Sequence, residues 1–179
     1  MYKIARDPRR FRMDPKDIES AETLRGTPAF HRLKKEFTAN PDTVQTYQIK
    51  HEDQSDPLKY TMVITPVSGY YKDQVYDFLV DIPLNYPYDP PRVYCLKKIF
   101  HPNIDSKTKK VCSHTFGLQW MPTYDVNSVT AAINNLLLEP NFNEPLNNAY
   151  ISTFKRTTEN EFQSDAFQEM VNNEYKANH

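Results

Sequence analysis

Four consecutive stretches of strand-like sequence constrain the fold more than any other feature of this chain. They are expected over residues 44–50, 58–65, 75–82 and 92–99. In the third stretch apolar side chains at every second position share one face, while Asp77 and Asp81 lie on the other. Because the connections between the stretches are short, the strands should pair as an antiparallel meander with one face covered by a helix.

A helix is predicted before the strands, over residues 28–39. Thr27 followed by Pro28 is typical of a helix start, because threonine caps the first turn and proline fits the first helical position. Apolar residues then recur at helical spacing, namely Phe30, Leu33 and Phe37.

Further helices are predicted after the strands. Asn127 and Ser128 can cap a helix with a continuous apolar stripe, which Glu139 and Pro140 end. Pro145 begins another helical stretch, and the last helix is apolar at positions 167, 170, 171 and 175. The sequence therefore predicts an α+β domain with an N-terminal helix, a four-stranded antiparallel meander sheet and C-terminal helices.

Composition excludes several classes of function. Lys and Arg total 22 against 23 Asp and Glu, so no overall positive charge favours nucleic acid. No apolar run approaches the roughly 20 residues that span a bilayer. With three glycines, the chain lacks the glycine-rich loops that cradle nucleotide phosphates. The first residues contain no long apolar segment of the export type, so we expect a cytoplasmic or nuclear protein with reduced cysteines.

Residues 1–26 differ in character from residues 27–179, which we assign to one folded domain. The first 16 residues carry six basic and two acidic side chains and few apolar ones. Such a segment cannot bury enough apolar surface to fold alone, and it is predicted to be a flexible basic extension. Two interpretations stay open: a plain disordered tail, or a short docking peptide that becomes ordered on a partner.

Cys112 is the candidate nucleophile. It lies within residues 100–126, a long stretch without sustained periodicity, which is typical of a functional region. The thiolate is a strong nucleophile. The other cysteine, Cys95, falls in a predicted strand and is most simply a small buried core residue.

Three kinds of chemistry would fit a cysteine here. A zinc site would use His101, Cys112 and His114, but the spacing is not that of a finger and no second pair follows, so no metal is expected. A cysteine hydrolase would need a histidine base oriented by a third group, and no such group is evident. A thiol that carries an acyl group needs only an accessible sulfur, a polar donor and a carboxylate. The sparse surroundings of Cys112 favour this last chemistry.

Several motifs together resemble the ubiquitin-conjugating enzyme family. They occur in register over roughly residues 28–176: Tyr86-Pro-Tyr-Asp-Pro-Pro91, His101-Pro102-Asn103, Cys112, Trp120-x-Pro122 and Glu139-Pro-Asn…Glu144-Pro-Leu-Asn147. Within the family the chain is most similar to the conjugating enzymes of neddylation. That narrower resemblance is carried by Gly69-Tyr-Tyr-Lys72, by residues 138–147 and by the start Met1-Tyr-Lys-Ile4.

The resemblance implies an acyltransferase with a cysteine thioester intermediate and no cofactor. Cys112 would accept the C-terminal glycine of a ubiquitin-like modifier from an activating enzyme and then offer it to a substrate lysine. Asn103 would support the active-site loop and the tetrahedral oxyanion, and Glu144 would position or deprotonate the lysine. His101 looks structural. Simpler interpretations stay open, with Asn103 as a turn-forming residue and Glu144 as a solvated loop charge.

The resemblance also implies protein partners. Tyr88, Pro122 and Thr123 match the two loops that meet ligases of the RING type, cullin-associated ligases among them. The first helix would contribute to that surface and to the contact with the activating enzyme. In the extension, the residues that would dock on the activating enzyme are Met1, Tyr2 and Ile4.

The sequence departs from the family pattern around the cysteine. The link that contains residues 105–110 is one residue longer than usual and lacks the customary glycine, and Ser113-His114-Thr115 is more polar than usual. The eight-residue step from Cys112 to Trp120 is kept, so the loop is expected to close. Ubiquitin is the alternative to the neddylation modifier. The other class of function is an inactive variant that only binds a modifier or a ligase.

Overall fold

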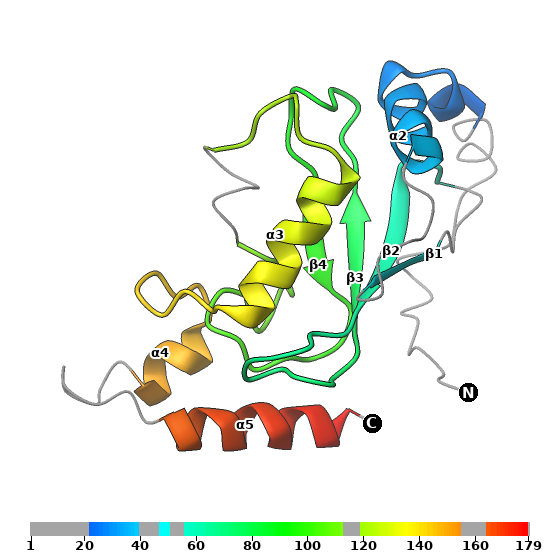
Figure 1. Ribbon diagram of the computed structural model, residues 1–179. Helices are drawn as coiled ribbons and strands as arrows, with labels where there is room; N and C mark the ends of the chain where they lie inside the picture. Colours follow the sequence, from blue (N-terminus) through cyan, green and yellow to red (C-terminus); the bar gives the residue numbers. More distant parts are fainter. Residues whose placement is uncertain (1–21, 40–46, 51–55, 113–118, 155–163, 179) are drawn as a thin grey trace.

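The computed structural model describes residues 22–39, 47–50, 56–112, 119–154 and 164–178. Within these ranges helices surround an antiparallel sheet (Figure 1). In chain order the elements are α2 (Pro28–Ala39), β1 (Tyr47–Lys50), β2 (Lys59–Ile64), β3 (Tyr76–Asp81), β4 (Arg92–Cys95), α3 (Val126–Leu138), α4 (Asn148–Phe154) and α5 (Ser164–Ala177). None of the helices in these ranges is both long and apolar enough to cross a membrane.

The strands form the predicted meander. Their order in the sheet is β1-β2-β3-β4, and each neighbouring pair is antiparallel. In β3 the predicted alternation holds, because Tyr76, Phe78 and Val80 are at most 1% exposed and the residues between them are half-buried. Figure 1 shows α3 crossing the sheet beside β3 and β4, with α2 at one end and α5 at the other. The predicted α+β fold is therefore confirmed, although β4 ends at Cys95, earlier than expected.

Helix α2 begins and ends where the sequence predicts. Pro28 is its first residue, and the side chain of Thr27 accepts a hydrogen bond from the amide three residues further on at 3.3 Å. Before this helix, residues 22–25 are also helical, and Leu24 packs against the core. The packed part of the chain therefore begins before residue 27, the boundary expected from the sequence. Residues 1–21 lie outside the described ranges.

Helix α3 begins at Val126 because Asp125, and not Asn127 or Ser128, is its N-cap. Asp125 Oδ1 accepts hydrogen bonds from the Ser128 amide at 2.9 Å and the Ser128 hydroxyl at 2.8 Å, and the Asp125 amide donates to Ser128 Oγ at 3.3 Å. This reciprocal pattern is a capping box with serine in the place of the usual glutamate or glutamine. The C-cap is Glu139, which agrees with the predicted end.

Helix α4 begins at Asn148, later than the predicted start at Pro145. Asn147 precedes it, and its Oδ1 accepts a hydrogen bond from the Tyr150 amide at 3.4 Å. This is the bond that an asparagine N-cap makes, and it explains the later start.

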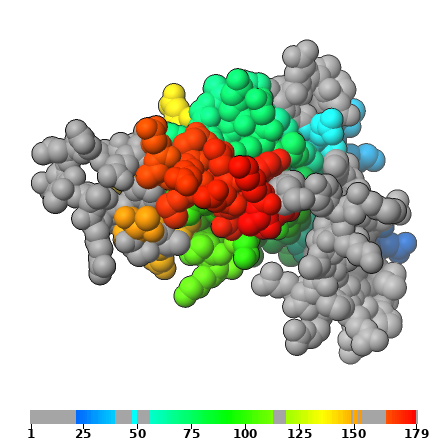
Figure 2. Space-filling view, turned by 90° about the horizontal axis from the view of Figure 1, so that it is seen from below, coloured from blue at the N-terminus to red at the C-terminus, as the bar shows by residue number. Residues whose placement is uncertain are grey.

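Helix α5 covers one end of the sheet. Phe167 and Val171 on its inner face are almost completely buried. Hydrogen bonds attach it to the segment before β3. Gln168 Nε2 donates to the Tyr70 carbonyl at 2.7 Å, and the Val75 amide donates to the Tyr175 hydroxyl of α5 at 3.2 Å. Figure 2 shows α5, in orange and red, lying directly against that blue-green segment.

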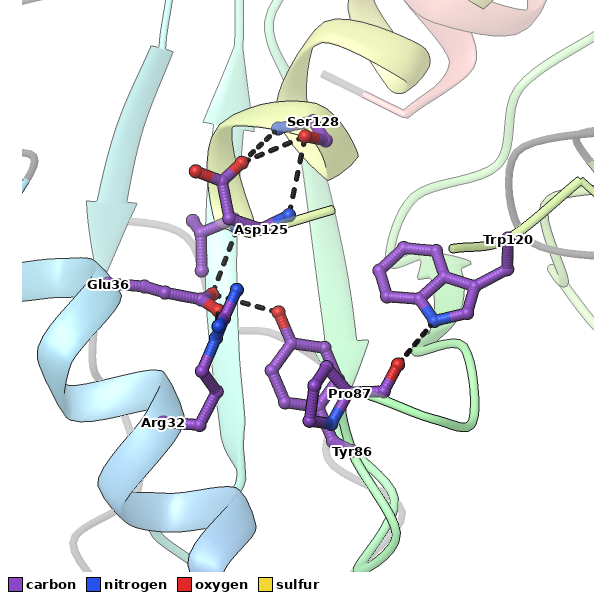
Figure 3. Close-up of polar contacts among 8 residues, drawn as sticks. Arg32, Glu36, Tyr86, Pro87, Trp120, Asp125 and Ser128 are labelled. Carbon is purple, nitrogen blue, oxygen red and sulfur yellow. Dashed lines mark hydrogen bonds and ion pairs between the residues drawn. The ribbon is translucent and has the colours of Figure 1, made fainter. Parts of the chain in front are cut away.

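Glu36 is a buried carboxylate that joins three elements. Only 6% of it is exposed. Its Oε2 accepts hydrogen bonds from the Tyr86 hydroxyl at 2.8 Å and the Val126 amide at 3.1 Å, and Arg32 donates to its Oε1. Figure 3 shows these groups converging between α2, the loop before β4 and the start of α3. Because a buried carboxylate is tolerated only when donors meet its charge, these contacts hold the three elements together.

Replacing Glu36 with alanine should lower the free energy of unfolding by about 2–4 kcal/mol, because the Tyr86 hydroxyl and the Val126 amide would stay buried without this partner. Denaturation by urea measures the change, and Glu36→Gln, which keeps one acceptor oxygen, should cost less. Lys35 lies exposed on the same helix, so Lys35→Ala is the matched control and should stay within about 0.5 kcal/mol of the parent. Equal losses in the two alanine variants would contradict the role given to the carboxylate.

Candidate active site

A short antiparallel ladder holds Cys112 in place. Ile104 and Val111 form its bridge, and the Cys112 amide donates to the Asn103 carbonyl at 2.9 Å, which sets these two residues opposite each other. Ile104 and Val111 are buried in the core. Because successive side chains on a strand point to opposite faces, Cys112 and Asn103 lie on the other face. The Cys112 thiol is free and exposed, as an acyl carrier requires.

Asn103 ties this ladder to the loop after α3. Its Nδ2 donates to the carbonyls of Asn141 at 2.8 Å and Glu144 at 3.2 Å, and its Oδ1 accepts from the Asn141 amide at 2.8 Å. Both amide hydrogens are therefore engaged in holding the loop. To donate to an oxyanion on Cys112, Asn103 would have to release one of these bonds, so the geometry favours its predicted support of the loop.

Further hydrogen bonds fasten the loop that carries Glu144. The amides of Leu146 and Asn147 both donate to the Pro102 carbonyl at 2.8 Å, and Asn147 Nδ2 donates to the His101 carbonyl at 3.0 Å. Glu144 itself is exposed, with its carbonyl held by the Asn103 side chain. These bonds keep the Glu144 segment on the side of the ladder that also presents the thiol. Sequence reasoning included Asn147 in a family motif but assigned it no role, because His101 and Pro102, which it contacts here, lie far away in the chain.

His101 is fully buried and held as a neutral ring. Its Nδ1 accepts from the Asn103 amide at 2.9 Å, which leaves the proton on Nε2 to be donated to the Leu136 carbonyl at 3.0 Å. Burial lowers the pKa of His101 from 6.5 to about 4. With both ring nitrogens occupied, His101 cannot serve Cys112 as a base, and it has the structural role expected from the sequence.

The turn from Asp105 to Lys110 closes without a glycine. Asp105 Oδ1 accepts from the amides of Thr108 at 2.5 Å and Lys107 at 3.0 Å and from the Thr108 hydroxyl at 2.8 Å. These bonds, with the Thr108 amide foremost, lower the pKa of the Asp105 carboxyl. Lys109 adopts the left-handed conformation at φ 62°, which costs a residue with a β-carbon roughly 1–2 kcal/mol. The longer link thus returns to the ladder at the cost of some backbone strain.

The residues expected to meet a ligase lie on the surface. Tyr88 is 71% exposed, and Pro122 and Thr123 are exposed as well. Met121 is 48% exposed beside them and extends the apolar surface. Sequence reasoning missed Met121, although a large apolar residue next to a proline in an irregular loop was a usable signal.

Trp120 joins the two loops of this surface. Its Nε1 donates to the Pro87 carbonyl at 2.7 Å, and its ring lies 6.0 Å from that of Tyr86 and 5.6 Å from that of Tyr124. Figure 3 shows the indole reaching across to Pro87, next to the tyrosine that donates to Glu36. The two exposed loops are therefore connected to each other through Trp120, and through Tyr86 and Glu36 they are connected to α2 and α3.

The remaining candidates from the sequence are the second cysteine, the possible metal ligands and the residues of the N-terminal extension. Cys95 is fully buried, and burial raises the pKa of its thiol to about 12. In the described ranges no group of three or more His, Cys, Asp or Glu side chains is placed to hold a metal ion. Residues outside those ranges include His114 and the expected docking residues Met1, Tyr2 and Ile4.

The fold and the site together define a class of protein. The family model of ubiquitin-conjugating enzymes matches residues 32–170, and the chain belongs to this family. Among relatives, the NEDD8-conjugating enzyme Ubc12 of Dictyostelium discoideum is 33% identical over 137 residues, which are 76% of this chain and 59% of that protein. The NEDD8-conjugating enzyme ubc12 of Schizosaccharomyces pombe is 38% identical over 126 residues, which are 68% of this chain and 67% of that protein.

A solved structure supports the same placement. The structure of Saccharomyces cerevisiae Ubc12 superposes with a TM-score of 0.67 at 29% identity, over 88% of this chain and 85% of that one. The chain matches about three fifths to two thirds of the length of the two curated relatives.

Lowering the pH from 7 to 5 should destabilise the protein by about 2 kcal/mol through His101. Its pKa is about 4 in the folded protein against 6.5 ordinarily, so between these values the unfolded chain binds a proton that the folded chain does not. This stability is complete above pH 6.5 and is lost as the pH falls towards 4. Urea denaturation at both pH values measures the loss, and His101→Asn should reduce the dependence. An imidazole that titrates near 6.5 in NMR spectra of the folded protein would contradict the prediction.

Proposed function

We propose that this protein is a conjugating enzyme that carries the modifier NEDD8 as a thioester on Cys112 and transfers it to lysines of substrate proteins. The observation that carries the proposal is the free, exposed thiol of Cys112 on a fixed ladder opposite Asn103. Membership of the ubiquitin-conjugating enzyme family supports the chemistry. The relatives that are themselves named NEDD8-conjugating enzymes support the choice of modifier.

In the loading step, the Cys112 sulfur attacks the carbonyl carbon of the modifier's terminal glycine, which is held on a cysteine of the activating enzyme. The new C–S bond forms as the old one breaks, and the activating enzyme's thiol leaves. Cys95 is unsuited to this step because it is buried and its raised pKa keeps it protonated. In the second step a lysine amine attacks the thioester carbonyl, the amide forms and the Cys112 thiol is released.

The surroundings of Cys112 fit a carrier of acyl groups better than a hydrolase. His101, two residues before Asn103, is committed at both ring nitrogens, so it cannot activate water. Glu144 is exposed on a fastened loop, where we assign it the role of positioning the incoming lysine or accepting its proton. Asn103 keeps that loop in register with the thiol.

We assign partner surfaces on the same basis. Tyr88, Pro122 and Thr123, extended by Met121, form an exposed surface for a RING-type ligase, cullin-associated ligases included. Helix α2 and the basic extension would contact the activating enzyme. Both cysteines are free, which suits the reducing cytoplasm or nucleus where we place the reaction. Ubiquitin as the cargo, or an inactive binding variant, are the alternatives.

Loading tests the proposal directly. Incubation with NEDD8, its activating enzyme and ATP should give an adduct that a reducing agent removes, and Cys112→Ala should abolish it. Cys112→Ser should give an oxyester that withstands the reductant, because the acyl bond is then to oxygen. Cys95→Ala is the matched control and should load normally. If the chain is loaded with ubiquitin by the ubiquitin-activating enzyme and not with NEDD8, then ubiquitin is the cargo. If neither modifier is loaded, the chain is better explained as an inactive variant that only binds a modifier or a ligase.

Removal of residues 1–21 tests the extension as a docking peptide. This cut spares Leu24, which packs against the core. If the extension docks, kcat/KM for loading should fall about tenfold, which corresponds to about 1.4 kcal/mol of binding. A synthetic peptide of residues 1–21 should compete with the full chain, and a Tyr2→Ala, Ile4→Ala version of it should compete poorly. Unchanged loading after truncation would leave the extension as a plain tail.

A further inference from the structure

Lys110 lies on the same face of the chain as Cys112. Val111 between them is buried, while both Lys110 and Cys112 are exposed. In an extended strand, residues two apart point to the same side with their Cα atoms about 6.5 Å apart. The two side chains therefore leave the chain on the same side, so the lysine amine can approach the sulfur that would carry the modifier.

The backbone holds this neighbourhood in place from both sides. The Asp105 amide donates to the Lys110 carbonyl at 3.0 Å, and the Val111 amide donates to the Val93 carbonyl at 2.9 Å. Lys110 also forms a β-bridge with Tyr94. Strand pairing on both sides therefore fixes the backbone at Lys110 and Val111. The placement of Lys110 beside Cys112 does not depend on the conformation of the neighbouring turn.

The lysine side chain is long enough to reach an acyl group on the sulfur. Its four-carbon stem places the amine roughly 6 Å from its own Cα. The acyl carbon of a thioester on Cys112 would project from the same face, and the reach of the amine plus an attack distance of about 3–3.5 Å spans the gap between the two residues. Reacting atoms held about 3–3.5 Å apart gain a large advantage over the same groups free in solution.

We infer that Lys110 is a self-modification site that takes the modifier from Cys112 within one molecule. The inference rests on the proposed function, since it requires the thioester. The neutral Lys110 amine attacks the thioester carbonyl carbon, the C–N bond forms and the C–S bond breaks. The Cys112 sulfur leaves with the electron pair, and the proton lost by the nitrogen passes to it through solvent. No oxidant or further reactant is needed.

The product would limit its own formation. A modifier joined to Lys110 by an amide bond sits two residues from Cys112 and covers the exposed face of the thiol. Such a molecule should be unable to accept or pass on a second modifier. Without a ligase and a substrate, the charged protein would therefore convert steadily into a blocked form.

A single-turnover experiment tests the inference. The full chain is loaded with NEDD8, or with ubiquitin if only that modifier loads, and a magnesium chelator then stops the activating enzyme. With no ligase or substrate present, an adduct that resists reducing agent should appear as the thioester decays, and peptide mass spectrometry should place it on Lys110. Its rate should not change over a tenfold range of protein concentration, because the transfer is intramolecular.

Two lysine variants separate position from general reactivity. Lys110→Arg keeps the positive charge and should reduce the resistant adduct at least tenfold while the thioester persists longer. Lys107 is exposed in the adjoining turn, so Lys107→Arg is the matched control and should leave the adduct unchanged. Equal melting temperatures would show that both variants fold. Tagged Cys112→Ala protein mixed with the charged chain should remain unmodified.

The outcomes distinguish the two proposals. A thioester without a resistant adduct, an adduct on other lysines, or a rate that rises with protein concentration would overturn the self-modification site and leave the proposed function intact. Failure of the chain to form a thioester with either modifier would overturn both.

Discussion

The site depends on the hydrogen bonds between residues 101–103 and the loop 141–147. Asn103 holds two carbonyls and one amide of that loop, and the Pro102 carbonyl accepts two more amides from it. Backbone N–H and C=O groups that are buried in irregular segments need hydrogen-bond partners. Here the two segments provide those partners for one another. These bonds join the strand of Cys112 to the loop of Glu144, and the fold therefore sets how the thiol and the carboxylate are placed relative to each other.

Much of the fold could be predicted because its signals are local. The alternation in β3 and the start of α2 are each encoded within a few residues, and both were found where expected. The N-cap of α3 was misplaced because Ser128, the third residue of the helix and the partner of Asp125 in its capping box, is of a residue type that is itself common at N-caps. The role of Glu36 escaped notice because the two partners that join it to other elements, Tyr86 and Val126, lie 50 and 90 residues away, where no local pattern reaches.

The candidate site shows the same division. The absence of periodicity around Cys112 indicated a functional segment, and the family motifs supplied the remaining candidates. What they could not supply was the bonding of each side chain. Asn103 was expected both to support a loop and to donate to an oxyanion, and only the structure shows that its hydrogens are already committed. The left-handed Lys109 was equally hidden, because such a turn usually contains the glycine that this chain lacks.

The position of Trp120 gives the molecule an internal optical reporter. It is the chain's single tryptophan, and its N–H is bonded to a carbonyl of the loop that displays Tyr88. Met121 follows it directly at the surface. Indole emission responds to the polarity around the ring and to the loss of such a bond, so any protein that binds to these loops would shift the fluorescence of the unlabelled chain. The fold thus makes recruitment at this surface visible in the native chain, without a dye or a tag.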